Sequence, residues 1–174
     1  MTPGTLLLAG AACAAACTDL SRRRVPNVLT FGLAAVAMVT AALQGPVHLL
    51  VAITLYCSLL LAGTVLFARG WMGGGDVKLL AAGAACVGWP GTVSFLVYVG
   101  LAGGVLALAE LARSRRLRGA MTDLALAASL GTLRQGVVLD PQRRKLPYAL
   151  AIAAGALLLL ASETFAPWLP LVRV

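Results

Sequence analysis

The sequence has few charged residues, and this scarcity already excludes the commonest kind of protein. Of its 174 residues, 60% are hydrophobic and only 11% are charged. A soluble domain carries about a quarter of its residues as charged side chains. The composition therefore indicates an integral membrane protein of one domain, residues 1–174. The net charge of +8 could suggest nucleic acid binding. However, the basic residues form short clusters between apolar runs, as juxtamembrane loops do.

Groups that bind metals or act as nucleophiles with a histidine base are also scarce. There is one histidine, His48, which is expected in a loop, and there are four cysteines, none in CxxC spacing: Cys13, Cys17, Cys57 and Cys86. Free cysteines in apolar runs usually pack as small hydrophobic side chains. We therefore expect neither a metal site nor a cofactor.

Long apolar runs are what the sequence has in abundance. A membrane-spanning helix needs roughly 17–25 apolar residues. The sequence predicts about six transmembrane helices, at residues 5–20, 28–43, 47–67, 77–89, 92–111 and 147–165. With the N-terminus outside, every lysine and arginine except Arg173 falls on the inner side, as the positive-inside rule requires. The predicted fold class is therefore an all-α polytopic membrane protein.

Two segments leave alternatives open. The run of residues 77–89 is only about 20 Å long as a helix. It could be a short full span, which we favour, or it could form a re-entrant pair with the next run. Between the last two runs, Leu126, Leu130, Leu133 and Val137 recur at helical spacing. This pattern predicts an amphipathic helix on the inner membrane surface, held by lipid headgroups; the alternative is a solvated cytoplasmic helix.

Acidic residues number only six, and two of them share a distinctive position. Asp19 ends the first predicted span, and Asp76 begins the fourth, so both are expected at the inner face of the membrane. Two carboxylates that meet in a poorly solvated site cannot both ionise easily, so one keeps a proton while the other is a base. Aspartic proteases use this arrangement to activate water against an amide carbonyl. The remaining acids are Glu110, Asp123, Asp140 and Glu163.

Glycines precede the second of these acids. Gly73, Gly74 and Gly75 would allow an extended substrate strand to approach Asp76 closely. Lys78 is expected to point away from Asp76 and to extend toward the membrane interface. Pro26 and Asn27 are expected to begin the second helix and to fix the turn after Asp19. The alternative is that the glycines form a flexible turn and Asp76 is a helix N-cap.

Three stretches of the sequence resemble the type IV prepilin peptidases, which are membrane aspartic proteases of the GxGD type. They are Asp19 followed by Arg24-Val25-Pro26-Asn27, then Gly73-Gly74-Gly75-Asp76-Val77-Lys78-Leu79, and a softer match at Lys145-Leu146-Pro147-Tyr148-Ala149. Together they extend over nearly the whole chain. The order and spacing of the first two are more specific than the GxGD motif alone.

The resemblance implies cleavage of the short basic leader of prepilin-like or pseudopilin proteins at the cytoplasmic face of the bacterial inner membrane, with Asp19 and Asp76 as the catalytic pair. Longer relatives carry a CxxC-containing N-terminal extension and methylate the new pilin terminus. This chain lacks those cysteines and resembles the short, peptidase-only members that process Flp-type pilins, so methyltransferase activity is not expected. Leader recognition stays open, because basic loops repel a basic leader; Asp123, Asp140 or lipid are candidates.

Two other functions are compatible with parts of the pattern. Intramembrane carboxylates and broken helices also suit a small proton- or ion-coupled transporter subunit. The chain shows no inverted repeat, however, and both acids lie at one face rather than at the midplane. The second alternative is a scaffold subunit in which Gly100 and Gly104 only pack against partner helices.

Overall fold

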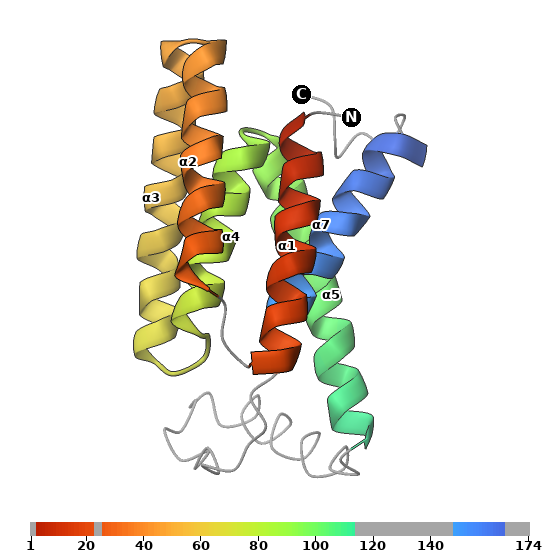
Figure 1. Cartoon of the computed structure of the whole chain (residues 1–174). Helices are drawn as coiled ribbons and strands as arrows, with labels where there is room; N and C mark the ends of the chain where they lie inside the picture. Colours follow the sequence, from red (N-terminus) through yellow and green to blue (C-terminus); the bar gives the residue numbers. More distant parts are fainter. Residues whose placement is uncertain (1–2, 23–25, 114–147, 166–174) are drawn as a thin grey trace, which may run out of the picture. The chain divides into compact units, whose positions relative to one another are not determined.

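The described part of the chain consists of helices. The computed structural model describes residues 3–22, 26–113 and 148–165 (Figure 1). Its helices are α1 (Pro3–Arg22), α2 (Asn27–Gln44), α3 (Pro46–Ala68), α4 (Gly74–Val87), α5 (Gly91–Arg113) and α7 (Tyr148–Phe165). Four of them contain a window that is long and apolar enough to cross a membrane, namely α1, α2, α3 and α5, and α7 is a shorter apolar helix. The predicted all-α, polytopic membrane fold is confirmed.

A glycine in a left-handed conformation ends α3. At the end of α3, Gly70 has a φ of 71°, and its N–H bonds to the Phe67 carbonyl at 2.9 Å. The next N–H, from Trp71, bonds to the Leu66 carbonyl at 3.0 Å. This pair of bonds is a Schellman closure, in which a left-handed residue satisfies the last helical carbonyls. The same glycine therefore ends α3 and turns the chain toward α4.

The chain divides into two compact units, Met1–Gly103 with Pro147–Val174 and, separately, Gly104–Leu146. Of the second unit the structure describes only residues 104–113, the last part of α5. The predicted amphipathic helix with its flanking Asp123 and Asp140 lies outside the described residues. So do Arg24, Val25, the Lys145-Leu146-Pro147 stretch and Arg173.

Helix α4 lies at the centre of the first unit, with α2 and α3 packed on one side and α1 and α7 on the other (Figure 1). Most of its 14 residues are buried: Asp76, Val77, Leu79, Ala81, Ala82, Gly83, Ala84 and Ala85. Alanine and glycine let neighbouring helix backbones approach closely, which is how helices associate inside a membrane. The small side chains of α4 thus explain its central place.

Close contacts fix how α1 lies against α4. A Cβ at Gly4 of α1 would collide with the carbonyl oxygen of Cys86, near the end of α4. A Cβ at Gly83 would lie 2.9 Å from Leu8, one helical turn further along α1. The two helices are therefore antiparallel. One more turn along each helix lie Ala12 and Leu79, and both are fully buried in the same cluster.

This register has two consequences. The C-terminal end of α1, which carries Asp19, meets the N-terminal end of α4, which carries Asp76. In addition, α4 accompanies α1 from its Asp19 end back to Gly4, through the whole apolar window that makes α1 a candidate span. The arrangement favours a short full crossing by α4 over the re-entrant alternative.

Candidate active site

Asp76 lies in the first turn of α4. The helix begins at Gly74, and its N-cap is Gly73, which is extended with φ −74° and ψ 144°. Asp76 is therefore the third residue of the helix and not the N-cap, so the N-cap alternative from the sequence is wrong. The N–H of Gly73 instead hydrogen-bonds to the Asp76 carboxyl group. This is the return half of a capping box, in which the third helical residue reaches back to the N-cap backbone.

The two oxygens of the Asp76 carboxyl group have different surroundings. Oδ2 lies over Gly73, where an added Cβ would come within 2.7 Å of it. Oδ1 is buried and has no hydrogen-bond partner within the described residues. A buried polar atom without a partner is rare and costs about 1–3 kcal/mol. Such an atom is a candidate for contact with a water molecule, a proton-sharing group or a substrate.

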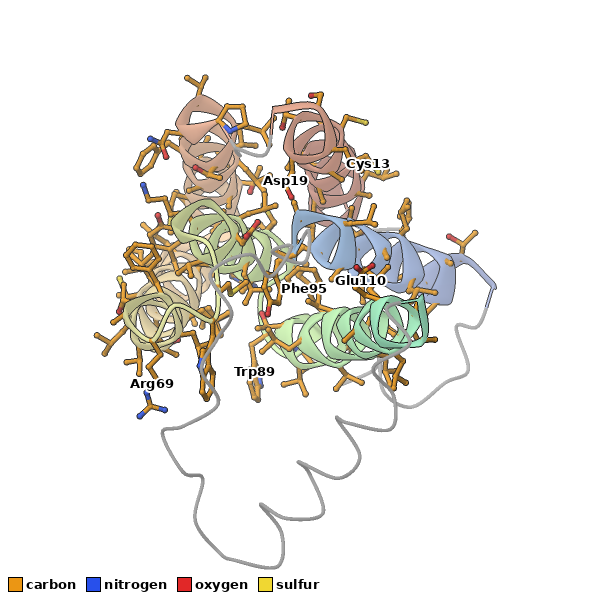
Figure 2. All side chains as sticks on the ribbon, turned by 90° about the horizontal axis from the view of Figure 1, so that it is seen from below. Cys13, Asp19, Arg69, Trp89, Phe95 and Glu110 are labelled. Atoms are coloured by element: carbon orange, nitrogen blue, oxygen red, sulfur yellow. The ribbon has the colours of Figure 1, made fainter. Side chains whose placement is uncertain are left out.

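Asp19 supplies the second carboxyl group. It lies in the last turn of α1, is half-buried, and its side chain is on the side of α1 that faces α4 (Figure 2). Its charge acts on the Asp76 carboxyl group. The structure therefore brings together two acids that are remote in sequence, in the way the helix order predicts. Two carboxylate charges within electrostatic reach repel each other, and the repulsion is strongest where solvation is poor.

The three glycines before Asp76 differ in conformation. Gly73 is extended, whereas Gly74 and Gly75 already belong to the first turn of α4. A side chain at Gly73 would displace the Asp76 carboxyl group, while one at Gly74 would only touch the Phe67 ring at an ordinary 3.5 Å. Backbone N–H groups in the first turn of a helix have no carbonyl partner within the helix.

A contact that the sequence analysis missed joins α4 to the start of α2. The Lys78 Nζ donates a hydrogen bond to Asn27 Oδ1 at 3.2 Å and lies 5.0 Å from the centre of the Phe31 ring. Helix α2 begins at Asn27, directly after Pro26, as predicted. Lys78 therefore links the N-terminal part of α4 to the start of α2. The spacing in the sequence predicts that Lys78 points away from Asp76. It does not predict the partner of Lys78, because Asn27 is 51 residues away in the sequence.

A further acid has its partner at the other end of α1. Glu163 of α7 accepts a hydrogen bond from the hydroxyl of Thr5 at 3.0 Å, at the end of α1 opposite Asp19. Within residues 3–22, 26–113 and 148–165, no group of three histidine, cysteine or acidic side chains could hold a metal ion. In that part of the chain, Asp19 and Asp76 are the acids that the structure brings together.

These features define a class: a multi-pass helical membrane protein with two interacting carboxyl groups where α1 ends and α4 begins. The model of the type IV leader peptidase family matches residues 6–108, more than half of the chain, and this stretch includes both Asp19 and Asp76. The chain belongs to that family, and it is accordingly a peptidase for prepilin-like substrates. No match was found among curated proteins or among solved structures.

Proposed function

We propose that this peptidase is an aspartic endopeptidase that removes the short basic leader of prepilin-like proteins, with Asp19 and Asp76 as its catalytic pair. The observation that carries the proposal is the Asp76 carboxyl group, which is buried, has one oxygen without a described partner, and experiences the charge of Asp19. A purely structural carboxylate would be expected to have its oxygens satisfied.

In the proposed reaction the pair carries one proton. The ionised member takes a proton from a water molecule, and the water oxygen attacks the carbonyl carbon of the scissile amide. The protonated member donates to the carbonyl oxygen, which develops negative charge. The tetrahedral intermediate then collapses: the C–N bond breaks, and the acid that took the proton from water gives it to the departing nitrogen. A hydroxyl group of the intermediate returns its proton to the other acid, so the pair again holds one proton. The N–H groups of the first turn of α4 offer further donors to the substrate.

Product analysis tests the reaction itself. The purified protein in liposomes is incubated with a prepilin-like precursor and with S-adenosylmethionine as a methyl donor, and the product masses are measured by intact mass spectrometry. The proposal expects two fragments whose masses add up to the precursor plus one water, with no methyl group on the new N-terminus. An intact precursor would contradict the peptidase proposal. A methylated terminus would contradict only the expectation that methyltransferase activity is absent.

We further propose that the carboxyl pair faces the cytoplasm. The support is the charge distribution of the sequence, because an N-terminus outside puts the basic clusters on the inner side. Two exposed tryptophans make a matched pair for a test: Trp71 in the turn between α3 and α4, and Trp89 in the turn between α4 and α5. In a cysteine-free background, an impermeant maleimide applied to intact cells should label Trp89→Cys and not Trp71→Cys. The reverse pattern would place the pair outside.

A further inference from the structure

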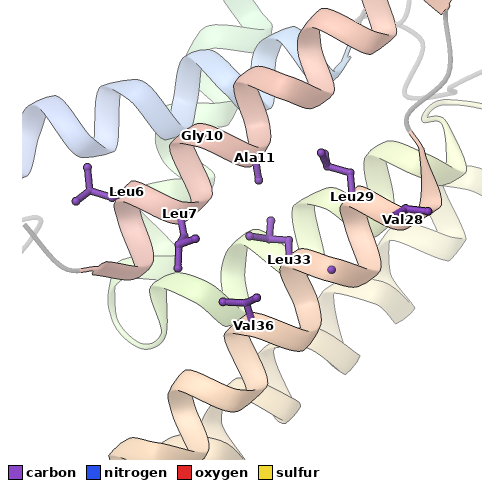
Figure 3. A pocket seen from close by; sticks show the side chains of 9 residues that line it. Leu6, Leu7, Gly10, Ala11, Val28, Leu29, Leu33 and Val36 are labelled. Carbon is purple, nitrogen blue, oxygen red and sulfur yellow. The ribbon is translucent and has the colours of Figure 1, made fainter.

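Helix α1 has two faces with different neighbours. One face lines an apolar pocket of about 520 Å³ together with α2, and Leu7, Gly10 and Val36 are among its residues (Figure 3). Gly10 and Asp19 are nine residues apart, so at 3.6 residues per turn they lie on opposite faces of the helix. The pocket therefore does not lead to the carboxyl pair. The neighbours of the pair are on the other face, where α1 packs against α4 and α7.

The packing of α7 on α1 shows which part of α7 lies beside Asp19. The two helices contact each other at Thr5 and Glu163, whose side chains are hydrogen-bonded at 3.0 Å. Seven residues later on α1 and seven residues earlier on α7, Ala12 and Ala156 are buried in the same core cluster, so the two helices run antiparallel. A further seven residues lead to Asp19 on α1 and to the first turn of α7, and Figure 2 shows the start of α7 next to Asp19.

Helix α7 begins with a phenol side chain, that of Tyr148. Tyr148 lies one turn before Ile152 and three turns before Leu159, so it shares their face of the helix. Both of these side chains are fully buried in the core, and Tyr148 is half-buried. Buried tyrosine hydroxyls usually have a hydrogen-bond partner, but that of Tyr148 has none among the described residues. This inward row of α7 therefore ends, beside Asp19, in an unused hydrogen-bond donor.

The residue after Tyr148 explains how the start of α7 can lie so close to α1. Ala149 is fully buried and is level with Asp19 in the antiparallel register. A small side chain at this position lets the two helix backbones approach closely. Tyr148 and Ala149 are also the described part of the third stretch of the sequence pattern, Lys145-Leu146-Pro147-Tyr148-Ala149, and this packing gives that stretch a place at the catalytic end.

The proposed reaction needs hydrogen-bond donors at the carbonyl oxygen of the scissile bond, because this oxygen gains negative charge when water attacks. The protonated acid of the pair supplies one donor. A further donor that is aimed at the developing charge stabilises the transition state more than the bound substrate, and so raises kcat. We propose that Tyr148 is a third catalytic residue, whose hydroxyl donates a hydrogen bond to this oxygen and keeps its own proton throughout. This inference rests on the proposed function.

Removing the hydroxyl group alone tests the proposal. Tyr148→Phe keeps the aromatic ring and its packing. Tyr98→Phe on α5 is the matched control, because Tyr98 is also half-buried, packs against the same core cluster as Ile152, and has no hydrogen bond from its hydroxyl to a described residue. Tyr98 differs in its place, since its neighbour Val99 lies against Gly155, two turns along α7 from Tyr148.

The first readout is kcat and KM, measured separately in liposomes for a short soluble peptide that spans the scissile bond. A donor that acts on the charge of the transition state should affect kcat and leave KM nearly unchanged. We expect Tyr148→Phe to lower kcat by about ten- to a hundredfold, with KM within about twofold of the wild type. Tyr98→Phe should keep both values within about twofold.

A second readout distinguishes direct contact with the reacting oxygen from an effect through the carboxyl pair. A peptide with a hydroxyl-bearing tetrahedral carbon in place of the scissile carbonyl resembles the tetrahedral intermediate, and such analogues bind in proportion to transition-state stabilisation. The inhibition constant of this peptide should rise about tenfold in Tyr148→Phe and should not change in Tyr98→Phe.

Four results would overturn the assignment of Tyr148 while leaving the carboxyl pair in place, with Asp76→Asn inactive in the same assay. They are a wild-type kcat in Tyr148→Phe, an equal loss of kcat in Tyr98→Phe, a loss that appears only in KM, and a lower kcat with an unchanged inhibition constant of the analogue. Peptide cleavage by Asp76→Asn would instead overturn the proposed function, and the role of Tyr148 with it.

Discussion

Acidic groups of two other helices lie beside the two ends of α1, and their situations are opposite. At one end, Glu163 has a carboxylate oxygen that accepts a hydrogen bond from Thr5, whose side chain is buried. At the other end, Asp76 has a buried oxygen without a described partner, and a second acid, Asp19, acts on it. The first arrangement satisfies an acid near a helix end. The second brings two acids together and leaves hydrogen-bonding capacity unused.

This difference separates a structural acid from a proposed catalytic one. An acid that joins two helices should matter for stability and little for chemistry. An acid with a buried oxygen that lacks a hydrogen bond destabilises the fold, so we expect such an acid to affect the rate of the reaction. Glu163, in the same bundle, therefore serves as a control for experiments on the proposed catalytic pair.

The largest expected effect comes from neutralising the pair. Asp19→Asn and Asp76→Asn should each lower kcat/KM for precursor cleavage by at least about a thousandfold, because an amide can neither accept the proton of water nor exchange one with its neighbour. Glu163→Gln is the matched control and should stay within about twofold of the wild type. The measurement is cleavage by purified protein in liposomes. Equal losses of kcat/KM in all three variants would contradict the distinction between the acids at the two ends of α1.

A smaller effect is expected from moving the Asp76 carboxyl group without changing it. Gly73→Ala would place a Cβ about 2.7 Å from Oδ2, so the carboxyl group must shift. A displacement of this kind can cost about a hundredfold in rate. We expect kcat to fall by about ten- to a hundredfold with the protein still folded, whereas Gly100→Ala should be silent. Wild-type kcat in Gly73→Ala would show that this glycine does not position the carboxyl group.

A change at the opposite end of α1, at Thr5, should lower the free energy of unfolding and leave kcat unchanged. Thr5→Val removes the buried hydroxyl that donates to Glu163, and we expect a loss of about 1–2 kcal/mol in the free energy of unfolding. Thr54→Val is the control: its hydroxyl is exposed and bonds only to its own helix, at the Leu50 carbonyl, so the change should be under about 0.5 kcal/mol. Denaturant titration in detergent micelles measures both. A fall in kcat in correctly folded Thr5→Val would contradict the structural assignment of this end.

The smallest effect is expected at Lys78, which lies two residues after Asp76 and contacts the start of α2. Lys78→Met removes an exposed hydrogen bond to Asn27 and a cation–π contact with Phe31. Exposed contacts of this kind contribute little, so we expect kcat/KM to fall by no more than about tenfold. If Lys78 acts through Asn27, Asn27→Ala should have a similar effect, and the double variant should lose no more than either single one. Multiplying losses would show that the two residues act separately.

Much of the fold could be predicted because helix boundaries depend on local chemistry. The predicted run of residues 47–67 became α3, Pro46–Ala68, since Gly45 and Pro46 begin it and the positive φ of Gly70 ends it. Which helices pack together depends on close contacts between helices at particular glycines. A sequence with many glycines does not show which of them make such contacts. Nothing local distinguishes Gly4, where an added Cβ would collide with the Cys86 carbonyl oxygen, from Gly10, where it would meet nothing within 4 Å.

The candidate site was predictable to a similar extent. Helix order alone put Asp19 and Asp76 at the same end of the bundle, and the structure places them there. The sequence could not show that Gly73 is the N-cap, because both glycine and aspartate suit that position. The bonds from Lys78 to Asn27 and from Thr5 to Glu163 also escaped prediction, since each joins residues that only tertiary packing brings together.

The central claim is that Asp19 and Asp76 act as one unit, and a double variant tests it most directly. Residues that act as a unit have strongly non-additive effects, because losing either one already stops the reaction. The kcat of the Asp19→Asn/Asp76→Asn double variant, measured on a short soluble peptide that spans the scissile bond, should therefore be about the same as that of either single variant. Two modest single losses that multiply in the double variant would contradict the claim, as would wild-type turnover in either single variant.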